Sequence, residues 1–202
     1  MATTSQPRTP SALVFSLLAV IALGGIVVIG VVTAGSAANS RPLVGMPLSM
    51  PGSVFEKTAE HGYIATGEMI ELTDDDLPSL AKLDPALLDA VREAAESAES
   101  DGVHLSVTSG WRSAAYQQWL LDQAVDKYGS LEEAAKWVST PDTSRHVSGD
   151  AIDIGPFDAT LWMQSNGPRF GLCQIYANEL WHYELASAHG GSCPALRDSA
   201  AG

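Results

Sequence analysis

The chain has 202 residues, enough for one domain with a hydrophobic core and an appendage, but too few for two large domains. All 24 acidic residues follow Pro42, whereas Arg8 and Arg41 precede it, so residues 42–202 carry a net charge of −15 within a chain total of −13. Such a domain repels polyanions, which argues against binding nucleic acid or an anionic membrane surface. The sequence has no GxxxxGK or GxGxxG loop and no repeat of 20–50 residues, so it indicates no nucleotide cofactor.

Residues 12–34 form a stretch of 23 residues without a charge. About 20 such residues cross the ~30 Å of a bilayer core as a helix, so this stretch predicts a transmembrane anchor. Because Arg8 lies before it and carboxylates dominate after it, residues 1–11 are expected in the cytoplasm and the rest of the chain outside the cell membrane. The alternative is a secreted protein whose signal peptide is cleaved near "AGSAANS". Both interpretations export the domain.

Residues 35–54 contain three prolines among small residues, which is typical of a linker. At ~3 Å per residue this linker reaches about 60 Å, far enough for an anchored domain to enter a surrounding wall. We expect the folded domain over residues 55–195 and a C-terminal tail over 196–202.

The first half of this domain opens with an irregular acidic stretch around residues 74–76, and a clear helix signal follows at Asp84 and Pro85, an N-cap and a first-turn proline. Asp101 and Gly102 end that helix, and the alternating residues of "VHLSV" at 103–107 predict a strand. The predicted inward face of the helix consists of small and aliphatic residues at helical spacing: Leu87, Leu88, Val91, Ala94, Ala95 and Ala98.

A second helix is predicted from after Ser113 to Gly129, and a third from Ser130, which has capping-box spacing to Glu133. Beyond Ser139 the sequence predicts strand-like structure through residues 143–156, a short helix near 158–164 and further strands within 172–186. These elements predict an α+β fold with a small, mostly antiparallel sheet and flanking helices. The predicted core residues of this half are Trp119, Leu120, Val125 and Trp137.

The two cysteines, Cys173 and Cys193, are expected to form a disulfide in an exported domain. Its loop of about 20 residues would contribute ~3 kcal/mol in the chain-entropy model. Two free thiols or a pair of zinc ligands are the alternatives.

The stretch "TSRHVSGDAIDIGP" at 143–156 suggests half of a metal site. Gly149 and Asp150 suit a two-residue II′ hairpin turn, and counting outward from this turn pairs His146 with Asp153. Opposed residues in a hairpin have Cβ atoms ~5 Å apart, so both side chains reach one ion. A surface hairpin with a chance histidine is the alternative.

A third ligand is expected from "ELWHYEL", where His182 lies between aromatic residues and near Glu179 and Glu184. The remaining histidines, His61, His104 and His189, are predicted to be exposed. A catalytic zinc site needs three protein ligands, an open position and a nearby carboxylate that is not a ligand. These residues therefore predict a zinc hydrolase with Glu179 or Glu184 as the base.

Three motifs in order resemble those of the VanY-type zinc D-alanyl-D-alanine carboxypeptidases of bacterial cell walls: "SGWRS" at 109–113, "SRHVSGDAID" at 144–153 and "ELWH" at 179–182. The resemblance covers roughly residues 55–190. It implies zinc held by His146, Asp153 and His182, with Glu179 as the base. Leu180 departs from the family pattern, which usually has proline there.

The resemblance also implies that Arg112 stabilises the reacting substrate, a peptidoglycan stem peptide ending in D-Ala-D-Ala. A guanidinium suits this role because it donates two hydrogen bonds to a carboxylate or an oxyanion. Ser144 and Gln117 are further candidates for binding the substrate, although structural roles are open to both. The expected activity is removal of the terminal D-alanine. The alternatives are an L,D-carboxypeptidase, a wall endopeptidase or a non-catalytic wall-binding domain.

Overall fold

The computed structural model describes residues 55–187 and 189–201. The predicted anchor at 12–34 and the predicted linker at 35–54 lie outside these residues. None of the helices in the described part combines the length and the apolarity needed to span a bilayer.

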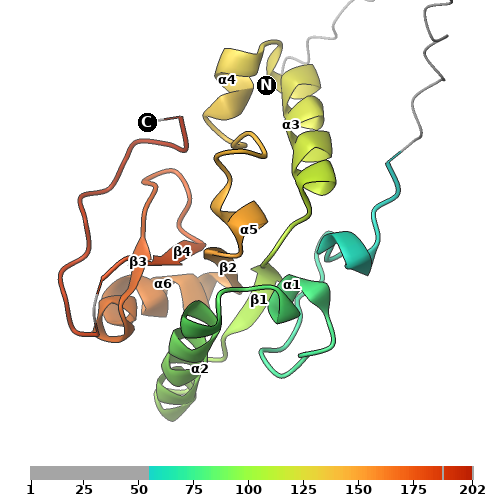
Figure 1. Cartoon of the computed structure of the whole chain (residues 1–202). Helices are drawn as coiled ribbons and strands as arrows, with labels where there is room; N and C mark the ends of the chain where they lie inside the picture. The colour runs from blue at the N-terminus through green and yellow to red at the C-terminus, as the bar shows by residue number, and fades with distance from the viewer. Residues whose placement is uncertain (1–54, 188, 202) are drawn as a thin grey trace, which may run out of the picture. The chain divides into compact units, whose positions relative to one another are not determined.

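The described elements mix helices of different lengths with short strands along the chain (Figure 1). In order they are η1 (Ala59–His61), α1 (Pro78–Ala81), α2 (Pro85–Ser100), β1 (Ser106–Ser109), α3 (Ala114–Tyr128), α4 (Leu131–Ala135), α5 (Arg145–Ser148), β2 (Ala151–Gly155), α6 (Phe157–Asn166), η2 (Gly167–Phe170), β3 (Leu172–Gln174) and β4 (His182–Leu185).

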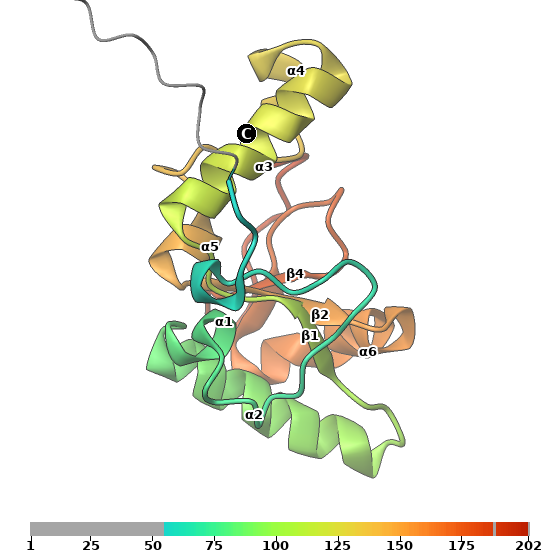
Figure 2. The same cartoon turned by 90° about the vertical axis from the view of Figure 1, so that its right-hand side faces the viewer.

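The four strands form one antiparallel sheet in the order β1-β2-β4-β3. Helices α2 and α6 lie on one side of this sheet, and α5 lies on the other side, towards α3 and α4 (Figures 1 and 2). The predicted α+β class with a small antiparallel sheet and flanking helices is therefore confirmed for the described residues.

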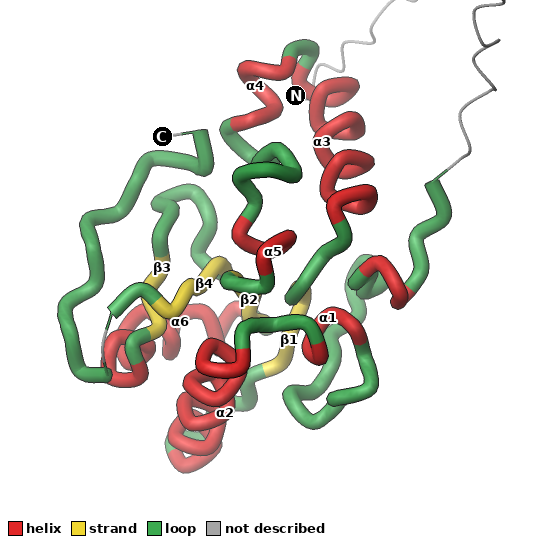
Figure 3. Tube along the Cα trace, in the orientation of Figure 1, coloured by secondary structure: helices red, strands yellow, loops and turns green. Residues whose placement is uncertain are grey.

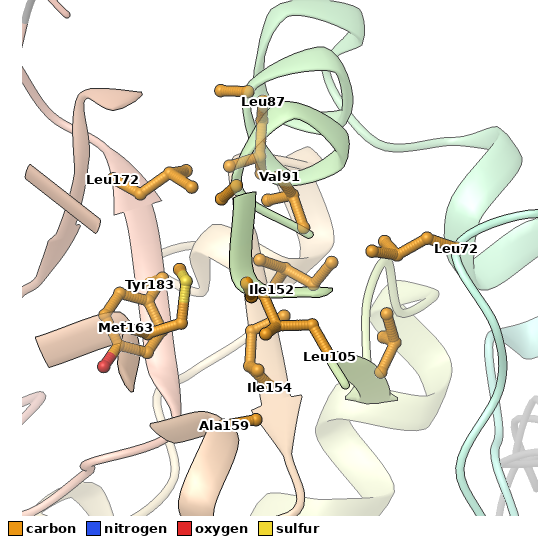
Figure 4. Packing of buried hydrophobic residues seen from close by; sticks show 14 of the residues in the cluster. Leu72, Leu87, Val91, Leu105, Ile152, Ile154, Ala159, Met163, Leu172 and Tyr183 are labelled. Carbon is orange, nitrogen blue, oxygen red and sulfur yellow. The ribbon is translucent and has the colours of Figure 1, made fainter. Parts of the chain in front are cut away.

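The core fills the space between the sheet and the α2–α6 side (Figure 4). Ile152 and Ile154 of β2 and Tyr183 of β4 point into it, where they meet Leu87 and Val91 of α2. Because alternate residues of a strand point to opposite faces, the residues between them point away from the core. This alternation directs Asp153, His182 and Glu184 to the α5 side of the sheet.

The predicted starts of three helices are confirmed, because Asp84, Ser113 and Ser130 are the N-caps of α2, α3 and α4. The Asp84 carboxylate accepts hydrogen bonds from the backbone N–H groups of Ala86 and Leu87, as an N-cap does. Ser113 and Ser130 cap α3 and α4 in the same way.

Three local predictions are wrong. Residues 103–105 are irregular, and β1 begins only at Ser106. Trp137 is 49% exposed and stacks on Tyr128 instead of entering the core. Residues Arg145–Ser148 form one helical turn, α5, in place of a strand (Figure 3).

Candidate metal centre

Three buried side chains from three elements meet on the α5 side of the sheet. They are His146 of α5, Asp153 of β2 and His182 of β4, each at most 6% exposed. The Nε2 atom of His146, the Oδ1 atom of Asp153 and the Nδ1 atom of His182 lie 3.2 Å from one another in all three pairs. Among the described residues, these three form the one group of such side chains with the spacing of metal ligands.

This triangle fits a zinc ion. Zinc has bonds of about 2.0–2.1 Å to histidine nitrogens and carboxylate oxygens, so a tetrahedral site separates its ligand atoms by about 3.3–3.4 Å. The observed separations of 3.2 Å match three corners of that tetrahedron. Two imidazoles and one carboxylate also form a donor set that zinc favours.

The sheet register brings two of the three side chains together. Asp153 and His182 are directly opposed on the antiparallel strands β2 and β4. Their neighbours Ile152 and Tyr183 are opposed in the same way and face the core. The hydrophobic alternation that anchors these strands thus also places an acid beside a histidine on the other face.

The predicted hairpin that pairs His146 with Asp153 is wrong. His146 lies on the helical turn α5, and β2 pairs with β4 instead. Gly149 ends α5 in the left-handed region with φ 82°, and its missing Cβ avoids the Lys82 carbonyl oxygen, which would lie 2.5 Å away. The Gly149 carbonyl oxygen then accepts a hydrogen bond of 2.8 Å from the Asp84 N–H. The chain reverses through a helix cap, and His146 still reaches Asp153.

The second nitrogen of each histidine has its own partner. His146 Nδ1 lies 2.8 Å from the carbonyl oxygen of Gly110, so this nitrogen donates its hydrogen and leaves Nε2 with its lone pair. His182 Nε2 lies 3.2 Å from the Glu184 carboxylate and donates there, which leaves Nδ1 as the metal-facing atom. Such outer partners fix the orientation and tautomer of metal-binding histidines.

The electrostatics of the cluster favour a cation. Burial opposes the charge of Asp153, but the two histidines and Arg112 hold the pKa of its carboxyl well below the usual range. Burial and the Arg112 charge lower the pKa of His146, so its imidazole is neutral. Burial also disfavours charge on His182, but hydrogen bonds to Asp153 and Glu184 raise its pKa to about 9. Metal binding near neutral pH therefore displaces a proton from His182.

Glu179 lies beside the triangle without belonging to it. Its Oε2 atom is 3.8 Å from Nδ1 of His182, and it lines the same cavity as His146 and His182. Burial raises the pKa of its carboxyl. Backbone hydrogen bonds from Glu179 to Tyr176 and from His182 to Glu179 close the turn that carries it, so this turn forms with Leu180 in place of proline.

Arg112 also lines the cavity, and its guanidinium bonds to three neighbours. Nε donates to Ser109 at 2.8 Å, Nη1 to Gln117 at 3.3 Å and Nη2 to the Oδ2 atom of Asp153 at 3.0 Å. The last bond leaves Oδ1 of Asp153 facing the histidines. Each terminal nitrogen keeps a second hydrogen for a ligand.

Gln117 and Ser144, the two weaker substrate-binding candidates, both line the cavity, but of the two only Gln117 is hydrogen-bonded through its side chain within the described part of the protein. Gln117 is 1% exposed and uses its amide to join Arg112 to the Ser139 carbonyl, so it supports the arginine. Ser144 is 6% exposed, and its hydroxyl has no hydrogen-bond partner among the described residues. Ser144 is therefore the better placed of the two to bind a ligand.

Glu184 and the three remaining histidines lie outside the metal-ligand triangle. Glu184 shares a strand face with His182 as expected, but it contacts Nε2, the nitrogen remote from the triangle. His104 and His189 are exposed as predicted, whereas His61 is half-buried and hydrogen-bonded to Ser113. None of these three histidines belongs to the metal-ligand group.

Sequence reasoning missed three contributors to the site: the Gly110 carbonyl, Arg145 and Tyr176. Arg145 joins Glu184 to Asp150, and Tyr176 packs against His182 with ring centroids 5.1 Å apart. The glycine in "SGWRS" and the arginine beside His146 were visible signals for two of them. The predicted disulfide between Cys173 and Cys193 is present, and it closes the segment that carries Glu179 and His182.

Comparison with known proteins agrees with this geometry. The family model for VanY, D-alanyl-D-alanine carboxypeptidase, matches residues 80–187. A D-alanyl-D-alanine carboxypeptidase of Enterococcus faecalis is 29% identical over 127 residues, which are 50% of this chain and 47% of the relative. The chain thus matches about half the length of that curated relative.

Two solved structures share the fold. One is a mutant of the vancomycin resistance D,D-pentapeptidase VanY from a VanB-type resistance cassette, in complex with Zn(II), with 26% identity, a TM-score of 0.50 and coverage of 61% of this chain and 79% of that chain. The other is VanYB in complex with D-alanine-D-alanine, with 27% identity, a TM-score of 0.50 and coverage of 58% and 76%.

Proposed function

The chain belongs to the VanY family of D-alanyl-D-alanine carboxypeptidases, and from this membership we propose that it is a zinc-dependent D,D-carboxypeptidase. Its substrate is a peptidoglycan stem peptide, from which it removes the terminal D-alanine. The observation that carries the proposal is the triangle of His146, Asp153 and His182, with Glu179 beside it. The solved relatives in complex with Zn(II) and with D-alanine-D-alanine support both the metal and the substrate.

His146, Asp153 and His182 would hold the metal. Bound zinc would supply Lewis acidity, which acidifies water and polarises a carbonyl oxygen. Arg112 and Glu184 hold Asp153 and His182 in the required orientation through hydrogen bonds. These hydrogen bonds fix the orientation of both ligand side chains.

Glu179 acts as the general base and then as the general acid. Its carboxylate takes a proton from the attacking water and delivers it to the amine of the departing D-alanine. The raised pKa of Glu179 suits both steps, because a group that titrates closer to neutral pH accepts and releases a proton readily.

Arg112 stabilises the oxyanion that forms at the scissile carbonyl. Hydrogens remain on its two terminal nitrogens after the bonds to Gln117 and Asp153. Charge that develops in a water-poor cavity is stabilised strongly by such a fixed cation. Ser144 supplies a further hydroxyl to orient the peptide.

We also propose that the domain works outside the cell membrane on an anchored chain. The charge-free stretch 12–34 with Arg8 before it supports this location, and the Cys173–Cys193 disulfide suits an oxidising compartment. Protease added to intact cells should remove the domain, whereas its persistence under conditions that degrade known surface proteins would contradict the location.

The activity is tested by measuring free D-alanine after incubation of the full chain with a pentapeptide ending in D-Ala-D-Ala. Zinc-loaded protein should release D-alanine, and a chelator should abolish the release. A matched pentapeptide ending in L-Ala-L-Ala serves as the control. Release of D-alanine from a tetrapeptide, by cleavage of its terminal L,D bond, without release from the pentapeptide would replace the proposal by an L,D-carboxypeptidase. Cleavage of intact wall without D-alanine release would replace it by a wall endopeptidase. Zinc binding without any cleavage would favour a wall-binding module.

A further inference from the structure

The catalytic cavity adjoins a second cavity that none of the proposed catalytic steps uses. Arg145, Tyr176 and Ala200 line both of them. The second cavity is completed by residues from the turn before α5, from β4 and from the C-terminal segment: Thr143, Glu184, Arg197 and Ala201. A peptide bound in the first cavity therefore lies next to the second.

The C-terminal residues 193–201 form one wall of this second cavity. The disulfide joins Cys193 to Cys173, and the backbone of Arg197 bonds to that of Ile175 at 2.9 Å and of Ala177 at 2.8 Å. Ala200 and Cys193 pack against a small buried cluster of Cys173, Ile175 and Tyr176. Figure 1 shows this red segment running beside the connection between β3 and β4. It lies beyond the 80–187 region that the family model matches.

Two guanidinium groups give the second cavity a positive character. Arg197 is exposed, and its side chain forms no hydrogen bond or ion pair with the described residues. Arg145 uses Nη1 for Asp150 and Nε for Glu184, which leaves Nη2 available. The carboxylate of Glu184 is occupied by Arg145 and His182, and its side chain is only 11% exposed.

This character is unusual for the domain. Residues 42–202 carry 24 acidic residues and a net charge of −15, so most of the surface repels anions. Beside the catalytic cavity, Arg197 offers a guanidinium that is not paired with a described carboxylate, and Arg145 offers its free Nη2 although its charge is paired with Asp150 and Glu184. Guanidinium groups recognise carboxylates through paired, charge-assisted hydrogen bonds.

We propose that Arg145 and Arg197 form a subsite for a carboxylate of the substrate peptide that lies outside the terminal D-Ala-D-Ala pair. The subsite rests on the proposed function, because the catalytic cavity must hold the end of the peptide. It gives the enzyme a preference for stem peptides with free side-chain carboxylates over their amidated forms.

The test uses two pentapeptides ending in D-Ala-D-Ala, one with free carboxylates at its second and third residues and the other with carboxamides there. Binding is measured by calorimetry to the zinc-loaded Glu179→Gln variant, and kcat/KM is measured with the active enzyme. We expect the carboxylate peptide to be favoured by about two- to fivefold, and Arg197→Gln to remove the preference. Arg169→Gln removes another exposed arginine, outside both cavities, and should retain the preference.

The outcomes separate the subsite from the proposed function. D-alanine release with equal use of both peptides, or a preference that survives Arg197→Gln, would overturn the subsite and leave the activity standing. An Arg197-dependent binding preference without D-alanine release would support the subsite and overturn the activity. Equal binding of both peptides without D-alanine release would overturn both.

Discussion

Replacing Glu184 by alanine should weaken zinc binding by about 10- to 100-fold, because Glu184 holds a metal ligand in place. Its Oε1 atom accepts the hydrogen of His182 Nε2 at 3.2 Å, and its Oε2 atom accepts from Arg145 at 3.3 Å. A hydrogen bond to a charged group contributes about 1.5–3 kcal/mol, and a tenfold change in affinity corresponds to about 1.4 kcal/mol. The loss of one such bond therefore accounts for the expected range.

The assay is a titration of metal-free protein with zinc against a chelating dye. Glu132→Ala, which removes an exposed glutamate of α4, should bind zinc as the wild type does. Glu184→Gln keeps an acceptor for His182, so it should bind zinc more tightly than Glu184→Ala and retain most of its turnover when saturated with zinc. Wild-type zinc affinity in Glu184→Ala would refute the orienting role. Abolished turnover in a zinc-saturated Glu184→Gln variant would make Glu184 the base.

Three further predictions concern stability. Leu87→Ala should lower the free energy of unfolding by about 2–5 kcal/mol in urea denaturation, because Leu87 is 1% exposed in the core; a loss below about 1 kcal/mol would contradict this packing. Replacing both Cys173 and Cys193 by alanine should cost about 3 kcal/mol, and unchanged stability would contradict a constraining role for the disulfide. Hydrogen bonds with Glu99 and Glu71 raise the pKa of His104 in the folded protein. The stabilisation that this ion pairing gives to the folded state is therefore complete below the unfolded pKa of about 6.5 and is lost as the pH rises through the folded pKa. His104→Gln should therefore cost more stability at about pH 5.5 than at about pH 9, by less than about 1 kcal/mol, and equal costs would contradict the pairing.

The sequence predicted best the elements that carry their own caps. Asp84, Ser113 and Ser130 each mark the start of a helix, because their side chains satisfy N–H groups that the helix leaves unpaired. The helix boundaries follow from local chemistry alone, and such chemistry is readable in one sequence.

The motif around His146 was harder to read, because one helical turn is too short to show a period. Gly149 suits a hairpin turn and a helix cap equally, since both require a positive φ. The choice is made by contacts distant in sequence, namely the close approach of Gly149 to Lys82 and its hydrogen bond from Asp84. The side chains that meet were nevertheless predicted correctly, because the acid and the histidines differ from the apolar pattern around them.

The wall of the second cavity was not predictable for a related reason. Arg197 and Ala200 lie in a segment with no periodicity, and only Cys193 indicated that this segment returns to the domain. Their position depends on the disulfide and on backbone pairing with residues 175–177. Long-range pairing of this kind leaves no local signal in the sequence.

The most direct test of the mechanism is the zinc content and the turnover of the Glu179→Gln variant, measured on the same preparation. The account predicts about one zinc per chain, as in the wild type, because Glu179 lies beside the ligand triangle and not within it. It also predicts that D-alanine release falls by about 10²- to 10⁴-fold, the contribution of a general base. Turnover at the wild-type level in this zinc-loaded variant would contradict the account.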